Sequence, residues 1–409
     1  MIKESKKLLP LLLILTLLVA IIPYYHPVSA VDAAQWTPVN LPTEGITGKW
    51  TLANGSDIRY LTMANDGTLY CYANPSGTTF TLFKSADNGR SWTTTGKVTD
   101  VITDIAALPQ DSKTIYYAAA SRVYKSVDAG NTFFPLPPNP GGAGSGNVLI
   151  TSLDIVRLDN ANIIAVSTID IDTAQYGGVY LLDESQGMST WVNTGIGNYD
   201  VYRVAFSPDY INDRQLIAVA SNEADTFTIS KINTMNWGQW ISKARIPGIV
   251  PSAAGIAFPD NYHGITVNAS FFIGIATGAD SGDVYQVNSA LASTASTAKD
   301  LHIGAVDGLD AVDIAGLATA GNTIIAGCAG SAGVYLSNDN GVSWTQCNKP
   351  PTGQTDTCVL IAPDFAAQHR AYAVTGGVES AFSYSIDGGL TWNQVRTIDF
   401  LLVQSEIPL

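Results

Sequence analysis

A polar turn that recurs at wide, regular spacing constrains this chain more than any other feature. The stretch KSADNGRSW at 84–92 returns as KSVDAGNTF at 125–133, LSNDNGVSW at 336–344 and YSIDGGLTW at 384–392. The aspartates of successive copies are 41, 211 and 48 residues apart, and the long gap has room for three further units of about 53 residues. Weaker copies begin at Gly178, Phe227 and Asp283, each keeping the strand that enters the turn. The sequence therefore predicts seven repeated units.

Each unit also has the pattern of several short strands. Apolar, β-branched runs are bounded by Gly, Pro, Asn and Asp, and no sustained helical period follows Ala30. Four such strands in each of seven units predict an all-β fold, a single seven-bladed β-propeller of four-stranded antiparallel blades at 57–400. We expect a signal peptide at 1–30, an N-terminal segment at 31–56 whose residues 35–42 supply a ring-closing strand, and a C-terminal tail at 401–409. The expected blades are 57–99, 100–144, 147–198, 199–249, 250–308, 309–353 and 354–400.

The repeated turn is expected to serve architecture rather than chemistry. A tight reversal between the third and fourth strand of a blade needs a glycine that can take a positive φ and a carboxylate that accepts turn amides. The serine adds a side-chain bond to the backbone, and the closing aromatic ring can enter the seam between blades. These positions are Ser85, Asp87, Gly89 and Trp92; Ser126, Asp128, Gly130 and Phe133; Ser337, Asp339, Gly341 and Trp344; and Ser385, Asp387, Gly389 and Trp392. We expect the turns on the outer rim, away from the channel.

The pattern SxDxGx(S/T)W resembles the Asp-box, or BNR repeat, of sialidases, sortilin-type receptors, xyloglucanases and a photosystem II assembly factor. The resemblance extends over nearly all of the chain after residue 30 and implies a β-propeller of that superfamily. It implies little about activity, because enzymes and non-enzymes share the repeat. The small number of candidate catalytic groups favours a non-catalytic member.

The first 30 residues predict export. A basic start with three lysines precedes an apolar run at 8–22, and VSA at 28–30 ends in small residues, which is the pattern of a secretory signal peptide cleaved after Ala30. The apolar run is shorter than the about 20 residues that span a bilayer, so we expect no integral membrane span in the mature chain. An uncleaved anchor is the alternative. The predicted location is secreted or at the extracellular cell surface.

The net charge argues against one class of partner, and the cysteines indicate a possible disulfide. A formal net charge of −14 at pH 7 would repel a phosphate backbone, which argues against nucleic-acid binding. Of the four cysteines, Cys71, Cys328, Cys347 and Cys358, the last two lie close in sequence and form the disulfide candidate, with buried free thiols as the alternative. No cysteine or histidine spacing indicates a metal site, and no cofactor is predicted.

One set of positions could carry chemistry on the channel wall. Aligning the units on the turn after their first strand makes Arg59, Asp104, Asp154, Arg203, Ala254, Asp313 and Cys358 equivalent. If the charged members face the channel, they form a weak candidate ligand-binding ring. Its three aspartates then offer an acid/base pair like that of glycoside hydrolases. The alternative, which we favour, is that the Asp and Arg side chains pair with one another around a water-filled axis.

The stretch ARIPGIV at 244–250 looks like the Arg-Ile-Pro signature of sialidases. In sialidases this signature precedes the first Asp-box, whereas here it follows two of the repeated turns. A short match of this kind has a high false-positive risk, so we interpret it as coincidence.

Together these features favour an exported, non-catalytic propeller that acts as a binding or assembly platform at the cell surface, for instance as a surface-layer or envelope-associated subunit. The expected partners are other envelope proteins or glycans, with self-association between copies. Polar loops such as 137–147 and 289–300 could supply the contact surface. A secreted glycoside hydrolase similar to a sialidase or xyloglucanase is one alternative. An assembly factor for a membrane complex, which follows from the resemblance alone, is the other.

Overall fold

The structure is a computed structural model that describes residues 57–73, 81–98, 100–185, 190–232, 239–264, 269–288, 296–309, 311–378 and 380–396. The expected signal peptide at 1–30, the ring-closing segment at 35–42 and the tail at 401–409 lie outside the described residues.

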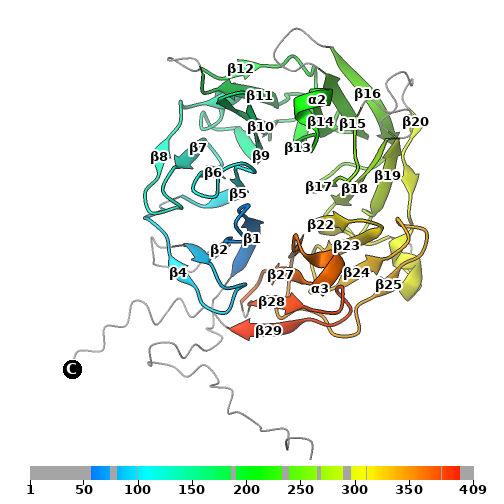
Figure 1. Ribbon diagram of the computed structural model, residues 1–409. Helices are drawn as coiled ribbons and strands as arrows, with labels where there is room; N and C mark the ends of the chain where they lie inside the picture. Colours follow the sequence, from blue (N-terminus) through cyan, green and yellow to red (C-terminus); the bar gives the residue numbers. More distant parts are fainter. Residues whose placement is uncertain are drawn as a thin grey trace, which may run out of the picture. The chain divides into compact units, whose positions relative to one another are not determined.

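The described strands form seven sheets arranged in a ring (Figure 1). Blade 1 holds β1 (Ile58–Met63), β2 (Leu69–Ala73), β3 (Leu82–Ser85) and β4 (Thr93–Thr94), and blade 2 holds β5 (Ile102–Ala107), β6 (Ile115–Ala119), β7 (Arg122–Ser126) and β8 (Phe134–Pro135). Blade 3 holds β9 (Val148–Leu158), β10 (Ala161–Asp170), β11 (Gly178–Asp183) and β12 (Val192–Asn193), and blade 4 holds β13 (Asp200–Phe206), β14 (Gln215–Ser221), β15 (Thr226–Ile232) and β16 (Trp240–Ile246).

The remaining three blades repeat this order. Blade 5 holds β17 (Ala253–Ala257), β18 (Ser270–Ala276), β19 (Val284–Asn288) and β21 (Lys299–Asp300). Blade 6 holds β22 (Ile314–Ala320), β23 (Thr323–Cys328), β24 (Val334–Ser337) and β25 (Thr345–Gln346), and blade 7 holds β26 (Thr357–Ile361), β27 (Ala371–Thr375), β28 (Phe382–Ser385) and β29 (Asn393–Arg396). Short helices interrupt the loops: η1 (Pro140–Gly142), α2 (Tyr210–Asp213), η2 (Ile303–Asp307) and α3 (Phe365–Gln368).

Within each blade, consecutive strands pair antiparallel, with the first strand nearest the centre of the ring (Figure 1). The middle of each second strand is buried, and LYCYA of β2 is buried along its whole length, because neighbouring blades cover both faces. The outermost strands of several blades are only two exposed residues long. The predicted all-β, seven-bladed propeller is confirmed.

Blade 4 departs from the expected four strands. Residues of β20 (Ser296–Thr297), which follow the Ser/Thr/Ala-rich insertion of unit five, pair in parallel with β16. This sheet therefore has five strands. The edge of β16 is thereby partly covered.

The core consists of seven hydrophobic clusters, and each of them joins two neighbouring blades. The cluster that closes the ring packs Ile58, Phe83 and Trp92 of blade 1 against Tyr372 and Phe382 of blade 7. Since a blade has no covered face of its own, burial of its apolar side chains depends on both neighbours. This dependence couples the stability of the seven blades around the ring.

The four clear copies of the repeated turn form the same hydrogen bonds. In each copy the serine hydroxyl lies 2.7–2.8 Å from the aspartate Oδ1, and the glycine N–H donates to the serine Oγ at 2.8–2.9 Å. The hydroxyl of the residue four positions after the aspartate donates to Oδ2 at 2.5–2.7 Å. The aspartate is therefore saturated within its own turn, which leaves it little capacity for chemistry.

The glycine and the closing aromatic of each turn meet the preceding blade. A Cβ on Gly89 would lie 2.1 Å from the Phe382 ring, and the Trp92 ring stands edge-on to Phe382 with centroids 5.1 Å apart. The other closing aromatics belong to the equivalent clusters of their own seams, with Trp344 between blades 5 and 6 and Trp392 between blades 6 and 7. The turn thus fixes one blade on the next.

Candidate functional site

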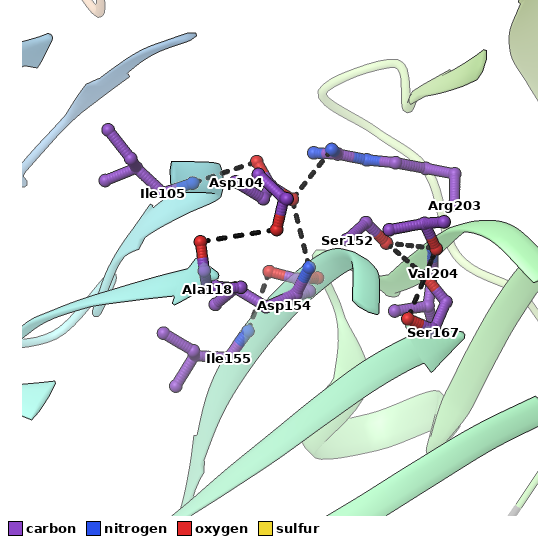
Figure 2. Close-up of polar contacts among 12 residues, drawn as sticks. Asp104, Ile105, Ala118, Ser152, Asp154, Ile155, Ser167, Arg203 and Val204 are labelled. Atoms are coloured by element: carbon purple, nitrogen blue, oxygen red, sulfur yellow. Dashed lines mark hydrogen bonds and ion pairs between the residues drawn. The ribbon is translucent and has the colours of Figure 1, made fainter. Parts of the chain in front are cut away.

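The inner strands of blades 2, 3 and 4 bring Asp104, Asp154 and Arg203 close together (Figure 2). Asp104 of β5 is 5% exposed, and its Oδ1 accepts the N–H of Ile105 at 3.0 Å. Its Oδ2 accepts the N–H of Leu153 at 3.0 Å and an N–H of the Arg203 guanidinium at 2.8 Å. Both oxygens of this carboxylate are therefore engaged.

Asp154 of β9 makes the equivalent contacts one blade further on. Its Oδ1 accepts the N–H of Ile155 at 2.8 Å, and its Oδ2 accepts the N–H of Phe206 at 2.7 Å. Burial raises the pKa of Asp154 to about 6. The hydrogen bonds from the two backbone N–H groups and the positive charge of Arg203 act in the opposite direction and lower it. The carboxyl group is thus easier to protonate than an exposed aspartate, although both of its oxygens are bonded to backbone.

These bonds share a structural cause. An innermost strand is paired on one side only, so amides on its free edge need partners outside the ladder. Asp104 caps an edge amide of blade 3, and Asp154 and Ser152 cap edge amides of blade 4, with the Val204 N–H donating to the Ser152 Oγ at 2.9 Å (Figure 2). The carboxylates of the channel wall therefore fasten one blade to the next.

Two members of the expected ring lie elsewhere. Arg59 is bound to Asp57 of its own strand start, with Nη2 2.8 Å from the carboxylate and about half of its side chain exposed. Asp313 precedes β22 and accepts the N–H groups of Gly278 and Gly282 at 2.6 and 2.7 Å, in the loop between β18 and β19. The expectation that Asp313 shares a site with Asp104 and Asp154 is wrong. The side chain of Asp313 is used to hold the neighbouring loop.

Asp313 belongs to a second repeat that the sequence reasoning missed. Asp57 and Asp356 also stand just before the first strand of their blades, and Asp200 is the first residue of β13. Each accepts a backbone N–H from the loop between the second and third strands of the preceding blade at 2.9–3.0 Å. Asp200 also accepts the N–H of Asp170, the last residue of β10, at 2.8 Å. The signal was present in the sequence as an aspartate immediately ahead of each of these apolar runs. These residues are architectural clamps.

The predicted disulfide is not formed. Cys347 follows the outermost strand β25, whereas Cys358 lies on the innermost strand β26, and all four cysteines are free thiols. Burial raises the pKa of the Cys358 thiol, although a hydrogen bond from the Leu61 N–H and the positive charge of Arg203 each lower it. Cys358 therefore stays protonated and contacts the inner edge of blade 1.

The sialidase-like stretch lies on the outer strand β16. Arg245 is about half exposed and pairs with Asp225, with Nη2 2.6 Å from the carboxylate. Asp225 also accepts the Gly248 N–H at 2.8 Å, so the arginine braces the turn that ends the blade. Arg245 does not reach the inner strands that carry Asp104 and Asp154.

Two features are absent from the part of the chain that the structure describes. No helix there is long and apolar enough to cross a membrane. No cluster of three or more His, Cys, Asp or Glu side chains there could hold a metal ion.

Comparisons with known proteins define the class. No family model matches the sequence, and no curated protein matches it. Among solved structures the chain is similar to YCF48 from Cyanidioschyzon merolae, with a TM-score of 0.53 and 15% identity over 81% of this chain and 96% of that chain. It is also similar to a puromycin-hydrolyzing peptidase from Mycobacterium tuberculosis, with a TM-score of 0.52 and 11% identity over 88% of this chain and 56% of that chain. At such identities the likeness shows the β-propeller fold and nothing finer.

Proposed function

We propose that this protein is an exported, non-catalytic β-propeller that serves as a binding or assembly platform at the cell surface. The observation that carries the proposal is the use of Asp104 and Asp154, the best-placed carboxylates of the inner wall. Each has both oxygens bonded to backbone amides, one of them on the next blade. Because the inner carboxylates hold the blades together, the loops and faces of the rigid ring are the parts that remain for binding.

A glycoside hydrolase would need the same carboxylates to act on a substrate rather than on the backbone. A general acid must present a proton to the leaving oxygen, and its partner must reach the sugar or a water molecule. Asp104 is paired with the Arg203 guanidinium at 2.8 Å, and Asp154 directs its oxygens at the N–H groups of Ile155 and Phe206. These contacts favour a structural role over acid/base catalysis.

The cell-surface part of the proposal rests on the signal-peptide pattern at 1–30 and on the acidic composition. The proposed partners are envelope proteins or glycans, and a surface-layer subunit would in addition contact copies of itself. No nucleic acid is proposed as a partner, because a net charge of −14 opposes it.

Cell fractionation tests the proposal. The host cells are separated into medium, envelope and cytosol with a marker protein for each, and the chain is followed by immunoblot and N-terminal sequencing. We expect a chain that starts after Ala30 in the envelope fraction. Recovery only in the medium or the cytosol, as a strict monomer, would contradict the proposal.

A further inference from the structure

A cavity of about 730 Å³ opens where loops of blades 5, 6 and 7 meet. The loops between the first and second strands of these blades form it together with the repeated turns of blades 6 and 7. Its lining includes Asp260, Gly321, Asn338, Ile361, His369 and Gly388. The volume lies in the range of roughly 300–1,000 Å³ that small-molecule sites occupy.

Hydrogen bonds between the loops hold the cavity walls in place. The Gly321 N–H donates to the Asp260 Oδ2 at 2.8 Å and ties blade 6 to blade 5. The Gly388 N–H donates to the His369 carbonyl at 3.0 Å and ties the turn of blade 7 to the end of α3. The ring of His369 also stands edge-on to the buried Phe365, with centroids 5.8 Å apart. The site is therefore formed before any ligand arrives, which lowers the entropy cost of binding.

Several polar groups on the lining retain unused bonding capacity. Within the described residues, Asp260 uses one carboxylate oxygen, and Asn338 accepts a hydroxyl bond from Thr323 at 3.0 Å while its amide N–H₂ has no partner. The imidazole of His369 is exposed and makes no side-chain hydrogen bond there. These groups supply an acceptor, a donor and a ring that can do either. A hydroxyl group, which both donates and accepts, matches all three.

Part of the remaining lining is apolar. Pro363 and Ala366 are exposed beside Ile361, and Phe365 is buried below them. Such a surface can cover the C–H face of a sugar ring, while the polar groups reach its hydroxyl edge. A ligand with a strong negative charge would meet the carboxylates of Asp260 and Asp387 at the wall.

We infer that this cavity binds a neutral, polyhydroxylated ligand, namely a short segment of a glycan. The inference rests on the proposed function as a binding platform and assigns that platform a site on blades 5 to 7. It places recognition on the face that carries the repeated turns, at a distance from Asp104 and Asp154.

The test uses two tryptophan variants on the four-residue helix α3. Ala366 lines the cavity, whereas Ala367, the next residue, is also exposed but does not line it. The purified wild type, Ala366→Trp and Ala367→Trp are applied to an array of neutral gluco-, manno-, galacto-, xylo- and N-acetylhexosamine oligosaccharides, with sulfated oligosaccharides as the anionic comparison. We expect the wild type and Ala367→Trp to bind the same neutral oligosaccharides, and Ala366→Trp to bind them at least tenfold more weakly.

A milder variant guards against misfolding of Ala366→Trp. Asn338→Ala removes one donor without adding bulk, and we expect it to weaken the same interactions about tenfold. Equal binding by all variants, preference for the sulfated probes, or no binding to any neutral oligosaccharide would overturn the inference. None of these outcomes affects envelope localisation, so failure of the glycan site can be told apart from failure of the proposed function.

Discussion

Aspartate residues behave in two opposite ways in this chain, depending on what surrounds the carboxylate. In the repeated turns, hydrogen bonds from Thr132 and Ser343 lower the pKa values of Asp128 and Asp339 to about 2. Inside the blades, burial raises the pKa of Asp154 on β9 to about 6 and that of Asp283, just before β19, to about 7. The turn aspartates therefore remain ionised over the range in which most folded proteins are stable, whereas the buried ones titrate within it.

Asp283 provides a pH-dependent test of this difference. The residue is 1% exposed; its Oδ1 accepts the N–H groups of Val284 and Ile303, and its Oδ2 has no partner among the described residues. Because its pKa is raised by burial from 3.8 to about 7 in the folded chain, the folded state binds the proton more tightly. The stability that protonated Asp283 contributes to the folded state is complete below pH 4 and is lost as the pH rises through 7.

We therefore expect Asp283→Asn, which cannot ionise, to match the wild type at pH 4. At pH 8 the variant should be more stable by at least about 1 kcal/mol. Urea unfolding at pH 4, 6 and 8 measures this difference, and parallel pH profiles of the two proteins would count against the argument.

The pair of Asp104 and Arg203 provides a second test at a single residue. Asp104→Asn leaves the half-buried guanidinium without its charged partner, so we expect a loss of about 2–3 kcal/mol of unfolding free energy. Arg59→Ala is the comparison, because it removes an exposed pair and should cost less than about 1 kcal/mol. Urea denaturation with equal losses for both variants would show that the inner pair has no special role.

At the scale of strands, the sequence predicted the strands well but predicted poorly which side chains lie on the same face of a strand. The first strands of blades 1, 2, 3, 4 and 6 contain a β-bulge, and those of blades 5 and 7 do not. A bulge adds one residue and reverses which side chains share a face. Arg59 and Asp313 come before the bulge of their strands, whereas Asp104 comes after the bulge of β5, so counting back from the following turn aligned positions in different environments. Only pairing partners, which lie in other strands, reveal the shift.

The repeated turn yields a prediction about the seam between blades. Gly89 and Gly67 both have a φ near +80°, but a Cβ on Gly89 would strike Phe382 at 2.1 Å, whereas nothing lies within 4 Å of a Cβ on Gly67. Gly67→Ala should cost about 1–2 kcal/mol from backbone strain. Gly89→Ala should cost at least about 2 kcal/mol more, because the ring-closing seam must shift. Thermal unfolding of both variants measures the extra loss of stability that the clash at position 89 causes. Similar melting temperatures would mean that the seam between blades 1 and 7 adjusts to the added methyl group without such a loss.

At the scale of the whole molecule, closure of the ring depends on the seam between blades 1 and 7. Phe382 is fully buried there between Trp92 and Tyr372. We expect Phe382→Ala to cost about 3–5 kcal/mol and to lower the stability of the ring as one cooperative unit. Phe134→Ala, at a position that is 57% exposed, should change stability by no more than about 0.5 kcal/mol. A small effect at Phe382 would indicate that the described ring does not rely on this seam.

The spacing of the repeated turns was enough to predict the propeller, because each turn marks the same point in a unit that must stack on its neighbours. The proposed glycan cavity could not be found in this way. Its lining comes from Asp260, Asn338 and His369 in three different units, and only Asn338 of these lies in a repeated turn. Such a site exists only once the ring has brought these loops together.

The measurement that tests the central claim most directly is a combined binding and cleavage assay on envelopes isolated from the host. The purified protein is incubated with the envelopes, its sedimentation is measured, and soluble sugars released into the same tubes are analysed by mass spectrometry. A non-catalytic platform predicts that the protein sediments with the envelopes and releases no sugar. Sugar release that Asp104→Asn or Asp154→Asn abolishes would instead make the protein a hydrolase and contradict the account.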